Sequence, residues 1–129
     1  MSDSPPTYPK FASLVGNTPL MDLTDMMTPN VHGVSVRVLG KAEFYNPSFS
    51  NKDRTMQAII NNAEEAGEIK RRSGDTLFSA TSGDTGIALA LIGASRGYNV
   101  VIITSKNCSN EKLTAIKMYG AKLILAGPG

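Results

Sequence analysis

Apolar residues in the second half of the chain gather in three short runs. TLFSA at 76–80, NVVIIT at 99–104 and AKLILA at 121–126 each have the length and character of a strand, and the middle run is continuous enough to be buried on both faces. The stretches between them are of helical length. The resulting order, β-α-β-α-β, requires crossover connections and predicts an α/β fold with a parallel sheet.

The two intervening stretches are each expected to form a helix that ends at a glycine. Residues 84–97 (DTGIALALIGASRG) are rich in small residues, whereas residues 109–120 (SNEKLTAIKMYG) begin with Ser109 or Asn110 as the N-cap. Apolar positions in the second helix recur at helical spacing. Its inward face is expected to hold Leu113, Ile116 and either Met118 or Tyr119.

The first half of the chain has a weaker pattern. Residues 1–10 are polar and proline-rich, which favours a flexible lead ahead of a domain at 11–129. The segment FASLVGNTPLMDL at 11–23 predicts a helical turn followed by a turn built on Gly-Asn and Thr-Pro. In VSVRVLGKAEF at 34–44, valines alternate with other residues and predict a strand of period two.

A third helix is expected to start at Ser50. Ser50 is a suitable N-cap, and Asp53 three residues later resembles a capping box with Asp in place of Glu. Gly67 is the expected stop. The apolar positions that follow at i, i+3, i+4 and i+7 are Met56, Ile59, Ile60 and Ala63, and they predict an amphipathic helix.

Composition excludes several classes of function. The chain has 129 residues, 41% of them hydrophobic, which is typical of one soluble domain. Thirteen basic and eleven acidic residues leave a net charge of +2, which argues against nucleic acid or a membrane surface as a partner. No apolar run has the length of a membrane span, and the start does not resemble a signal peptide. We therefore expect a soluble, cytoplasmic protein.

The chain has one cysteine, Cys108, and one histidine, His32. A disulfide within the chain and a zinc site built on cysteines are therefore excluded, and we expect no bound metal. Cys108 precedes a helix start, which favours a thiolate, although a packed and unreactive thiol is the simpler interpretation.

The segment TSGDTG at 81–86 follows a strand and opens a helix. Backbone N–H groups there are unpaired, and the helix dipole favours negative charge, so a carboxylate or phosphate suits the loop. The positions that add hydroxyl donors or allow close approach are Thr81, Ser82, Gly83 and Thr85. The simpler alternative is a plain turn capped by Ser82 or Asp84. The spacing matches neither a dinucleotide nor a nucleoside triphosphate motif.

Lys52 lies in YNPSFSNKDR, at the expected start of the third helix. A cation there opposes the helix dipole, and the neighbouring Arg54 repels it. Both effects favour the neutral amine, which is the form that Schiff-base chemistry requires. The alternative is an ordinary exposed lysine paired with Asp53 or Glu43.

Four segments, in order, resemble one family. VGNTPL at 15–20, NPSFSNKDR at 46–54, TSGDTGIALA at 81–90 and SNEKLTAIKMYGAKLIL at 109–125 are similar to the N-terminal part of the cysteine synthases (O-acetylserine sulfhydrylases). These are fold type II enzymes that depend on pyridoxal 5'-phosphate. Cystathionine β-synthase is the nearest alternative within the same family.

The resemblance implies that Lys52 forms a Schiff base with pyridoxal phosphate and moves the α-proton of an amino-acid substrate. The residues that the resemblance assigns to the substrate α-carboxylate are Thr81, Ser82, Gly83 and Thr85. Asp84 stands where the family normally has an Asn that donates to the phenolic oxygen of the cofactor. The implied reaction is β-replacement, in which O-acetylserine and sulfide give cysteine and acetate. A homo-oligomer or a complementing chain is the implied assembly.

Two departures from the family pattern leave alternatives open. An ionised Asp84 repels a phenolate-like oxygen instead of donating to it. The phosphate cradle and the residue facing the pyridine nitrogen come later in the family than the segments matched here, and few helices are available to cover a parallel sheet, so the sequence is expected to be the front of a larger domain. The alternatives are a catalytically inactive relative acting as a binding or regulatory module, a cystathionine β-synthase-like enzyme, and an unrelated small ligand-binding domain.

Overall fold

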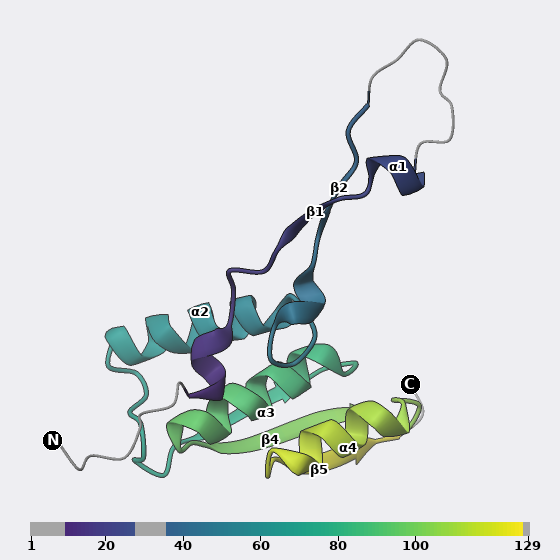
Figure 1. Cartoon of the computed structure of the whole chain (residues 1–129). Coiled ribbons are helices and arrows are strands. Elements are labelled where there is room, and N and C mark those ends of the chain that lie inside the picture. Colours follow the sequence, from purple (N-terminus) through teal and green to yellow (C-terminus); the bar gives the residue numbers. More distant parts are fainter. Residues whose placement is uncertain (1–9, 28–35, 128–129) are drawn as a thin grey trace, which may run out of the picture.

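The computed structural model describes residues 10–27 and 36–127 (Figure 1). His32 and all but the last residue of the expected lead at 1–10 lie outside the described residues. A thin arm formed by residues 20–27 and 36–41 projects away from the compact body, against which residues 11–14 pack (Figure 1).

The three expected strands form one parallel sheet. They are β3 (Thr76–Ala80), β4 (Asn99–Ser105) and β5 (Lys122–Ala126), hydrogen-bonded in the order β3-β4-β5. In register, Phe78 of β3 lies opposite Val101 of β4. The prediction of an α/β fold with a parallel sheet is therefore confirmed.

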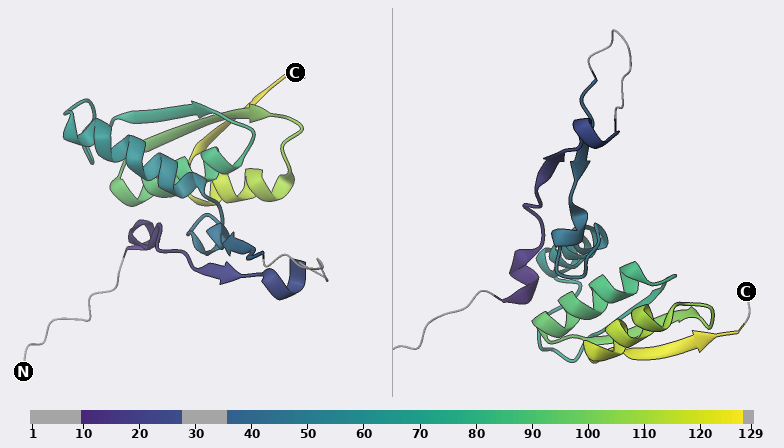
Figure 2. Two further views of the ribbon diagram at one scale, coloured as in Figure 1. Left: turned by 90° about the horizontal axis from the view of Figure 1, so that it is seen from above. Right: turned by 45° about the vertical axis from the view of Figure 1, so that its right-hand side comes forward.

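Three helices lie on one side of this sheet: two pack on the strands, and the first packs against the second. They are α2 (Lys52–Glu65), α3 (Asp84–Arg96) and α4 (Asn110–Met118), and the view from above shows all three on the same side of the strands (Figure 2). Each helix ends at a glycine of positive φ, as the sequence predicted. These glycines are Gly67, Gly97 and Gly120, with φ of 75°, 79° and 80°.

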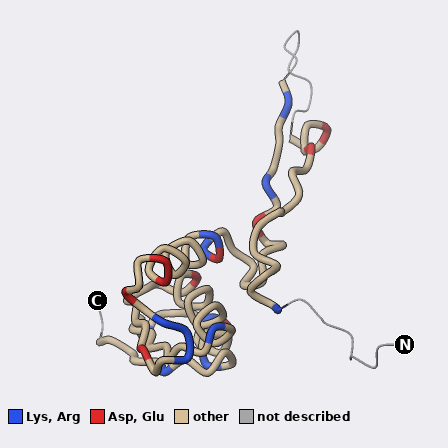
Figure 3. Tube along the Cα trace, turned by 90° about the vertical axis from the view of Figure 1, so that its left-hand side faces the viewer, with Lys and Arg blue, Asp and Glu red and all other residues tan. Residues whose placement is uncertain are grey.

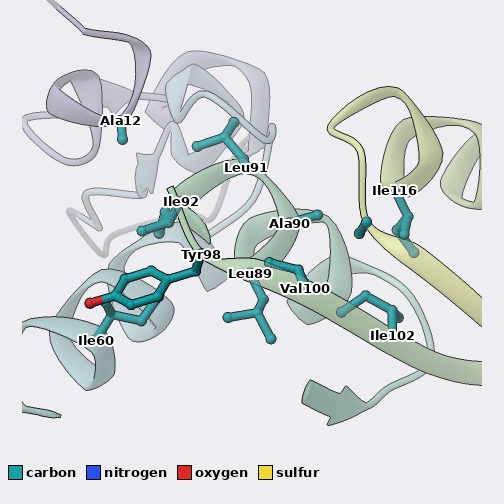
Figure 4. Packing of buried hydrophobic residues seen from close by; sticks show 11 residues of the cluster. Ala12, Ile60, Leu89, Ala90, Leu91, Ile92, Tyr98, Val100, Ile102 and Ile116 are labelled. Carbon is teal, nitrogen blue, oxygen red and sulfur yellow. The ribbon is translucent and has the colours of Figure 1, made fainter. Parts of the chain in front are cut away.

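The core lies between the sheet and α3. Ile92, Ile102 and Ile116, from α3, β4 and α4, are all fully buried (Figure 4). Gly93 permits this packing, because a Cβ built on it would lie 2.3 Å from Cγ2 of Val100. On α4, Tyr119 and not Met118 turns inward: Met118 is 73% exposed.

The opposite face of the sheet is open. No helix among the described residues packs on it, and its apolar side chains are partly or largely exposed. They are Phe78, Val101, Ile103 and Ile124. Phe78 is 75% exposed, and an apolar groove of about 360 Å³ runs between β3 and α2. Ile59 of α2, expected inside, is 54% exposed because it lines this groove.

The arm is built from short elements. η1 (Phe11–Leu14) packs on α3 and leads out into β1 (Leu20–Asp22) and α1 (Thr24–Met27) of the arm, and β2 (Leu39–Lys41) and η2 (Glu43–Tyr45) return to the body. β1 and β2 pair antiparallel.

The strand expected at 34–44 is wrong in extent. Only residues 39–41 are strand, Val36 and Val38 lie outside it, and Val34 is not among the described residues. The partner strand β1 has only three residues, so the ladder ends where its partner ends.

Candidate functional site

Lys52 is the first residue of α2, and a buried carboxylate fixes the loop before it. Asp53 is fully buried and accepts hydrogen bonds from the backbone N–H of Ser48, at 2.7 Å, and from the Ser48 hydroxyl. The expected capping box between Ser50 and Asp53 is therefore wrong: Asp53 reaches back five residues instead of three. Ser50 Oγ instead accepts from the backbone N–H of Lys52, at 3.2 Å. The N-cap residue is Asn51, one residue later than predicted.

Arg54 points away from Lys52 and into a polar cluster. Its guanidinium donates to both carboxylate oxygens of Glu43, at 3.0 and 3.2 Å, and to Thr18 Oγ1 at 2.9 Å. Arg54 holds the pKa of Glu43 below its usual range. Asn46 joins the cluster by donating to Glu43 and accepting from the N–H of Gly16. The VGNTPL segment is thereby tied to the lysine segment.

These contacts exclude the simple pairing considered for Lys52. Asp53 bonds to Ser48 and Glu43 bonds to Arg54, so neither carboxylate serves the lysine. Lys52 is exposed, and its amine has no hydrogen bond or ion pair to another described residue. The repulsion expected from Arg54 is also offset, because Glu43 neutralises that guanidinium.

The loop 81–86 connects the C-terminal end of β3 to α3. Thr81 donates its N–H to Ile103 O at 2.9 Å, and Thr81 Oγ1 accepts from the N–H of Gly83 at 3.1 Å. Gly83 has φ +148° and is the N-cap residue. Neither Ser82 nor Asp84 caps the helix, so the alternative of a plain side-chain-capped turn is wrong.

The start of α3 is consequently left with free donors. The first backbone N–H of α3 with an acceptor among the described residues is that of Ile87, which donates to Gly83 O at 3.0 Å. By contrast, α4 is capped by the Ser109 hydroxyl, which accepts from the N–H of Lys112. The N–H groups of residues 84–86 are therefore available to an anion.

The N-terminal part of α4 packs over this loop. Lys112 forms an ion pair with Asp84, with Nζ and Oδ1 3.0 Å apart. The thiol of Cys108 donates to the carbonyl of Ser82 at 3.5 Å. Sequence reasoning missed Lys112, although βαβ order brings the starts of α3 and α4 to the same edge of the sheet.

Thr104 lies at the same edge of the sheet. It follows Ile102 on the helix-covered face of β4, and a Cβ on Gly86, in the first turn of α3, would touch Ile102. Thr104 is 3% exposed, and Oγ1 is buried with no hydrogen-bond partner among the described residues. A buried hydroxyl without a partner is costly and is common where a ligand binds.

Glu64 joins the C-terminal ends of α2 and α3. Its carboxylate accepts from Arg71, from Arg96 at 3.0 Å and from the hydroxyl of Tyr98 at 2.9 Å. The pKa of Glu64 is lowered to about 2, and the hydrogen bond from Arg71 is the largest cause. Basic positions, blue in Figure 3, lie along the chain at this end of the body. A cavity of about 340 Å³ there is lined by Lys10, Arg71, Arg72, Ser95 and Arg96.

Comparison with known proteins decides the family. The family described as "Pyridoxal-phosphate dependent enzyme" matches residues 11–129. The chain belongs to this family. Cysteine synthase B of Escherichia coli is 45% identical over 111 residues, which are 86% of this chain and 35% of that protein. Cystathionine beta-synthase of Saccharomyces cerevisiae is 44% identical over 111 residues, which are 86% of this chain and 21% of that protein.

A solved structure shares the fold of this chain. The crystal structure of O-ureido-L-serine synthase superposes with a TM-score of 0.77 at 33% identity, over 95% of this chain and 36% of that chain. The chain thus spans between about a fifth and somewhat over a third of the length of these relatives. The resemblance inferred from four motifs is confirmed at the level of the family, whose members depend on pyridoxal phosphate.

Two further observations concern the described residues only. None of their helices is long and apolar enough to cross a bilayer. Their histidine, cysteine and carboxylate side chains also form no group of three or more that would bind a metal ion.

Proposed function

We propose that the chain provides the reactive lysine and the carboxylate-binding loop of a pyridoxal-phosphate-dependent β-replacement enzyme. The observation that carries the proposal is that an amine and a set of backbone N–H groups, none with a partner among the described residues, stand at the starts of two neighbouring helices. Lys52 has an unpartnered amine at the start of α2, and α3, which packs beside α2, begins with uncapped N–H groups. The membership of the chain in the family supports the same assignment.

Lys52 is proposed to bind the cofactor covalently through its amine and to move the substrate α-proton. Its position suits both tasks, because the Asp53–Ser48 and Arg54–Glu43 contacts fix the backbone on either side while the side chain stays free. A rigid backbone with a mobile amine can alternate between holding a cofactor and transferring a proton.

The loop is proposed to hold the substrate α-carboxylate. Its N–H groups at 84–86 and the positive end of the α3 dipole favour an anion. The residues that contribute hydroxyl donors or close backbone approach are Thr81, Ser82, Gly83 and Thr85. A Cβ at Gly83 would meet the side chain of Lys112, and Thr104 adds a buried hydroxyl without a partner among the described residues at the same sheet edge. These residues fit an amino acid bound beside Lys52.

The cofactor proposed for this site is pyridoxal 5'-phosphate. When bound, it supplies an electron sink that acidifies the α-proton and favours loss of a β-substituent. Lys52 would hold it, and Asp84 is the proposed contact at the position of the family's amide donor.

The proposed reaction is that of cysteine synthase, in which O-acetylserine and sulfide give cysteine and acetate. The similarity to cystathionine beta-synthase makes the condensation of serine with a thiol amino acid the second candidate. We propose a homo-oligomer or a complementing chain as the assembly, supported by the open apolar face of the sheet. Sedimentation of the protein, alone and after cofactor addition, tests the assembly.

The decisive experiment is reductive trapping of the cofactor. The chain is incubated with pyridoxal phosphate, reduced with borohydride and digested, and the labelled peptide is identified by mass. Label on Lys52 that disappears in Lys52→Arg, and persists in Lys106→Arg as a matched exposed control, supports the proposal. Equal labelling of both lysines, or none at Lys52, refutes it and leaves the binding or regulatory module. Product analysis with each substrate pair then separates the two reactions.

A further inference from the structure

A carboxylate side chain at Asp84 conflicts with an anion-binding loop. Asp84 is the first residue of α3, so its charge lies beside the N–H groups proposed to bind the substrate carboxylate. Two like charges a few ångströms apart disfavour each other, and here the Asp84 side chain is 48% exposed, so water moderates the effect. On its own, an ionised Asp84 would therefore cancel much of the attraction that the helix start offers.

The structure places a cation against this carboxylate from a different helix. Lys112 Nζ lies 3.0 Å from Asp84 Oδ1, and its alkyl chain crosses over Gly83. A Cβ built on Gly83 would lie 2.4 Å from Cδ of Lys112 and 3.3 Å from Nζ. The lysine thus occupies the space that a side chain at Gly83 would fill. Asp84 in turn raises the pKa of Lys112, mainly through their hydrogen bond.

Other contacts hold Lys112 in place. The backbone N–H of Lys112 is bound by the Ser109 cap, and the Cys108 thiol donates to the carbonyl of Ser82 within the loop. The start of α4 is thereby attached to the loop at one point besides the ion pair, the contact of Cys108 with Ser82. The direction of the lysine side chain follows from where α4 starts.

We propose that Lys112 neutralises Asp84, so that a loop containing a carboxylate can still bind the carboxylate of a ligand. Lys112 is a positioning residue that acts through Asp84. The inference rests on the proposed role of the loop in binding the substrate carboxylate. It extends that role by naming a residue on α4 that sets the charge of the loop, and it concerns carboxylate-bearing ligands as a class.

The test compares acetate binding by full-length variants that lack the charge at residue 84, at residue 112 or at both. Acetate is titrated into the uniformly ¹⁵N-labelled protein without cofactor, and affinity is measured from the backbone amide shifts of residues 82–86. Lys112→Met removes the cation, Asp84→Asn removes the anion, and the double variant removes both. We expect acetate affinity to fall about three- to tenfold in Lys112→Met, to rise by a similar factor in Asp84→Asn, and to return to the wild-type value in the double variant.

Matched variants separate charge from structure. Lys112→Arg keeps the charge and is expected to bind acetate as the wild type does, and Lys106→Met removes an exposed cation elsewhere without effect. Unchanged affinity in Lys112→Met overturns the proposal, as does a wild-type loop whose amides show no saturable shift. A double variant as weak as Lys112→Met also overturns it, because the lysine would then contact the ligand directly.

Reductive labelling of Lys52 in the same samples separates this proposal from the proposed function. If Lys52 is labelled but acetate affinity is the same in all the charge variants, the role of Lys112 is overturned and the proposed function stands. If the acetate affinities of the variants follow the expected order but Lys52 is not labelled, carboxylate binding by the loop is supported and the cofactor assignment is refuted.

Discussion

Asp53 and Ser48 are joined by two hydrogen bonds, from the backbone N–H and the hydroxyl of Ser48 to the two oxygens of the buried carboxylate. This contact closes the loop that ends at Lys52. Asp53→Asn keeps the size but loses the charge and one acceptor, so we expect a loss of about 2–4 kcal/mol in the free energy of unfolding. Urea denaturation measures it. A loss equal to that of Asp25→Asn, an exposed aspartate on α1, would contradict the assigned role.

Glu64 predicts an acid-dependent loss of stability. Its pKa is lowered from 4.5 to about 2 in the folded chain, so its stabilising contribution is complete above pH 4.5 and is lost as the pH falls toward 2. Glu64→Gln removes this contribution, on the order of 2 kcal/mol at neutral pH, and flattens the profile in that window. Urea midpoints between pH 2 and 6 test this. Glu65→Gln, an exposed neighbour, is the control, and a wild-type slope in Glu64→Gln would show that Glu64 is not responsible.

A side chain at position 83 is expected to lower the free energy of unfolding by an amount that depends on Lys112. Gly83→Ala combines an unfavourable φ with a clash against the Lys112 side chain, so we expect a loss of about 2–3 kcal/mol. Gly67→Ala shares the positive φ but meets nothing within 4 Å, and we expect about 1 kcal/mol there. Denaturation of Gly83→Ala in a Lys112→Ala background isolates the clash. If the cost is the same in both backgrounds, the lysine does not occupy that space.

The exposure of Phe78 predicts that the chain associates with other chains through the open face of the sheet. It is 75% exposed on an edge strand, beside other apolar side chains, and such surfaces favour contact with other chains. We expect Phe78→Thr to reduce concentration-dependent association in sedimentation velocity. Met118→Thr changes a side chain of similar exposure on α4 and is expected to have little effect. Equal behaviour of the two variants would argue against this face.

Local signals in the sequence were sufficient for the sheet and the ends of its helices. Gly67, Gly97 and Gly120 ended helices as predicted because a left-handed C-cap depends on one residue and its neighbours. The order of strands and helices likewise followed from short apolar runs and the length of the stretches between them.

What sequence reasoning missed depended on tertiary contacts. The capping box assigned to Asp53 failed because a buried Ser48 competed for the carboxylate. The ion pair of Asp84 with Lys112 joins residues on different helices, and its geometry arises only once α3 and α4 pack on the same sheet. The free start of α3 was missed as well: both Ser82 and Asp84 are good caps by residue type, but the N-cap residue is Gly83, and Asp84 pairs with Lys112.

The bond that Glu64 makes with Arg96 has a mechanical consequence. It fastens α2 to α3 at their C-terminal ends, where Tyr98 adds a second tie. Between the described residues, no hydrogen bond joins the first turns of the same two helices. With about 20 Å of helix between the two ends, the angle set at Glu64 determines where Lys52 lies relative to the start of α3. The ion cluster at the far end of the two helices thus helps to fix the position of the reactive lysine.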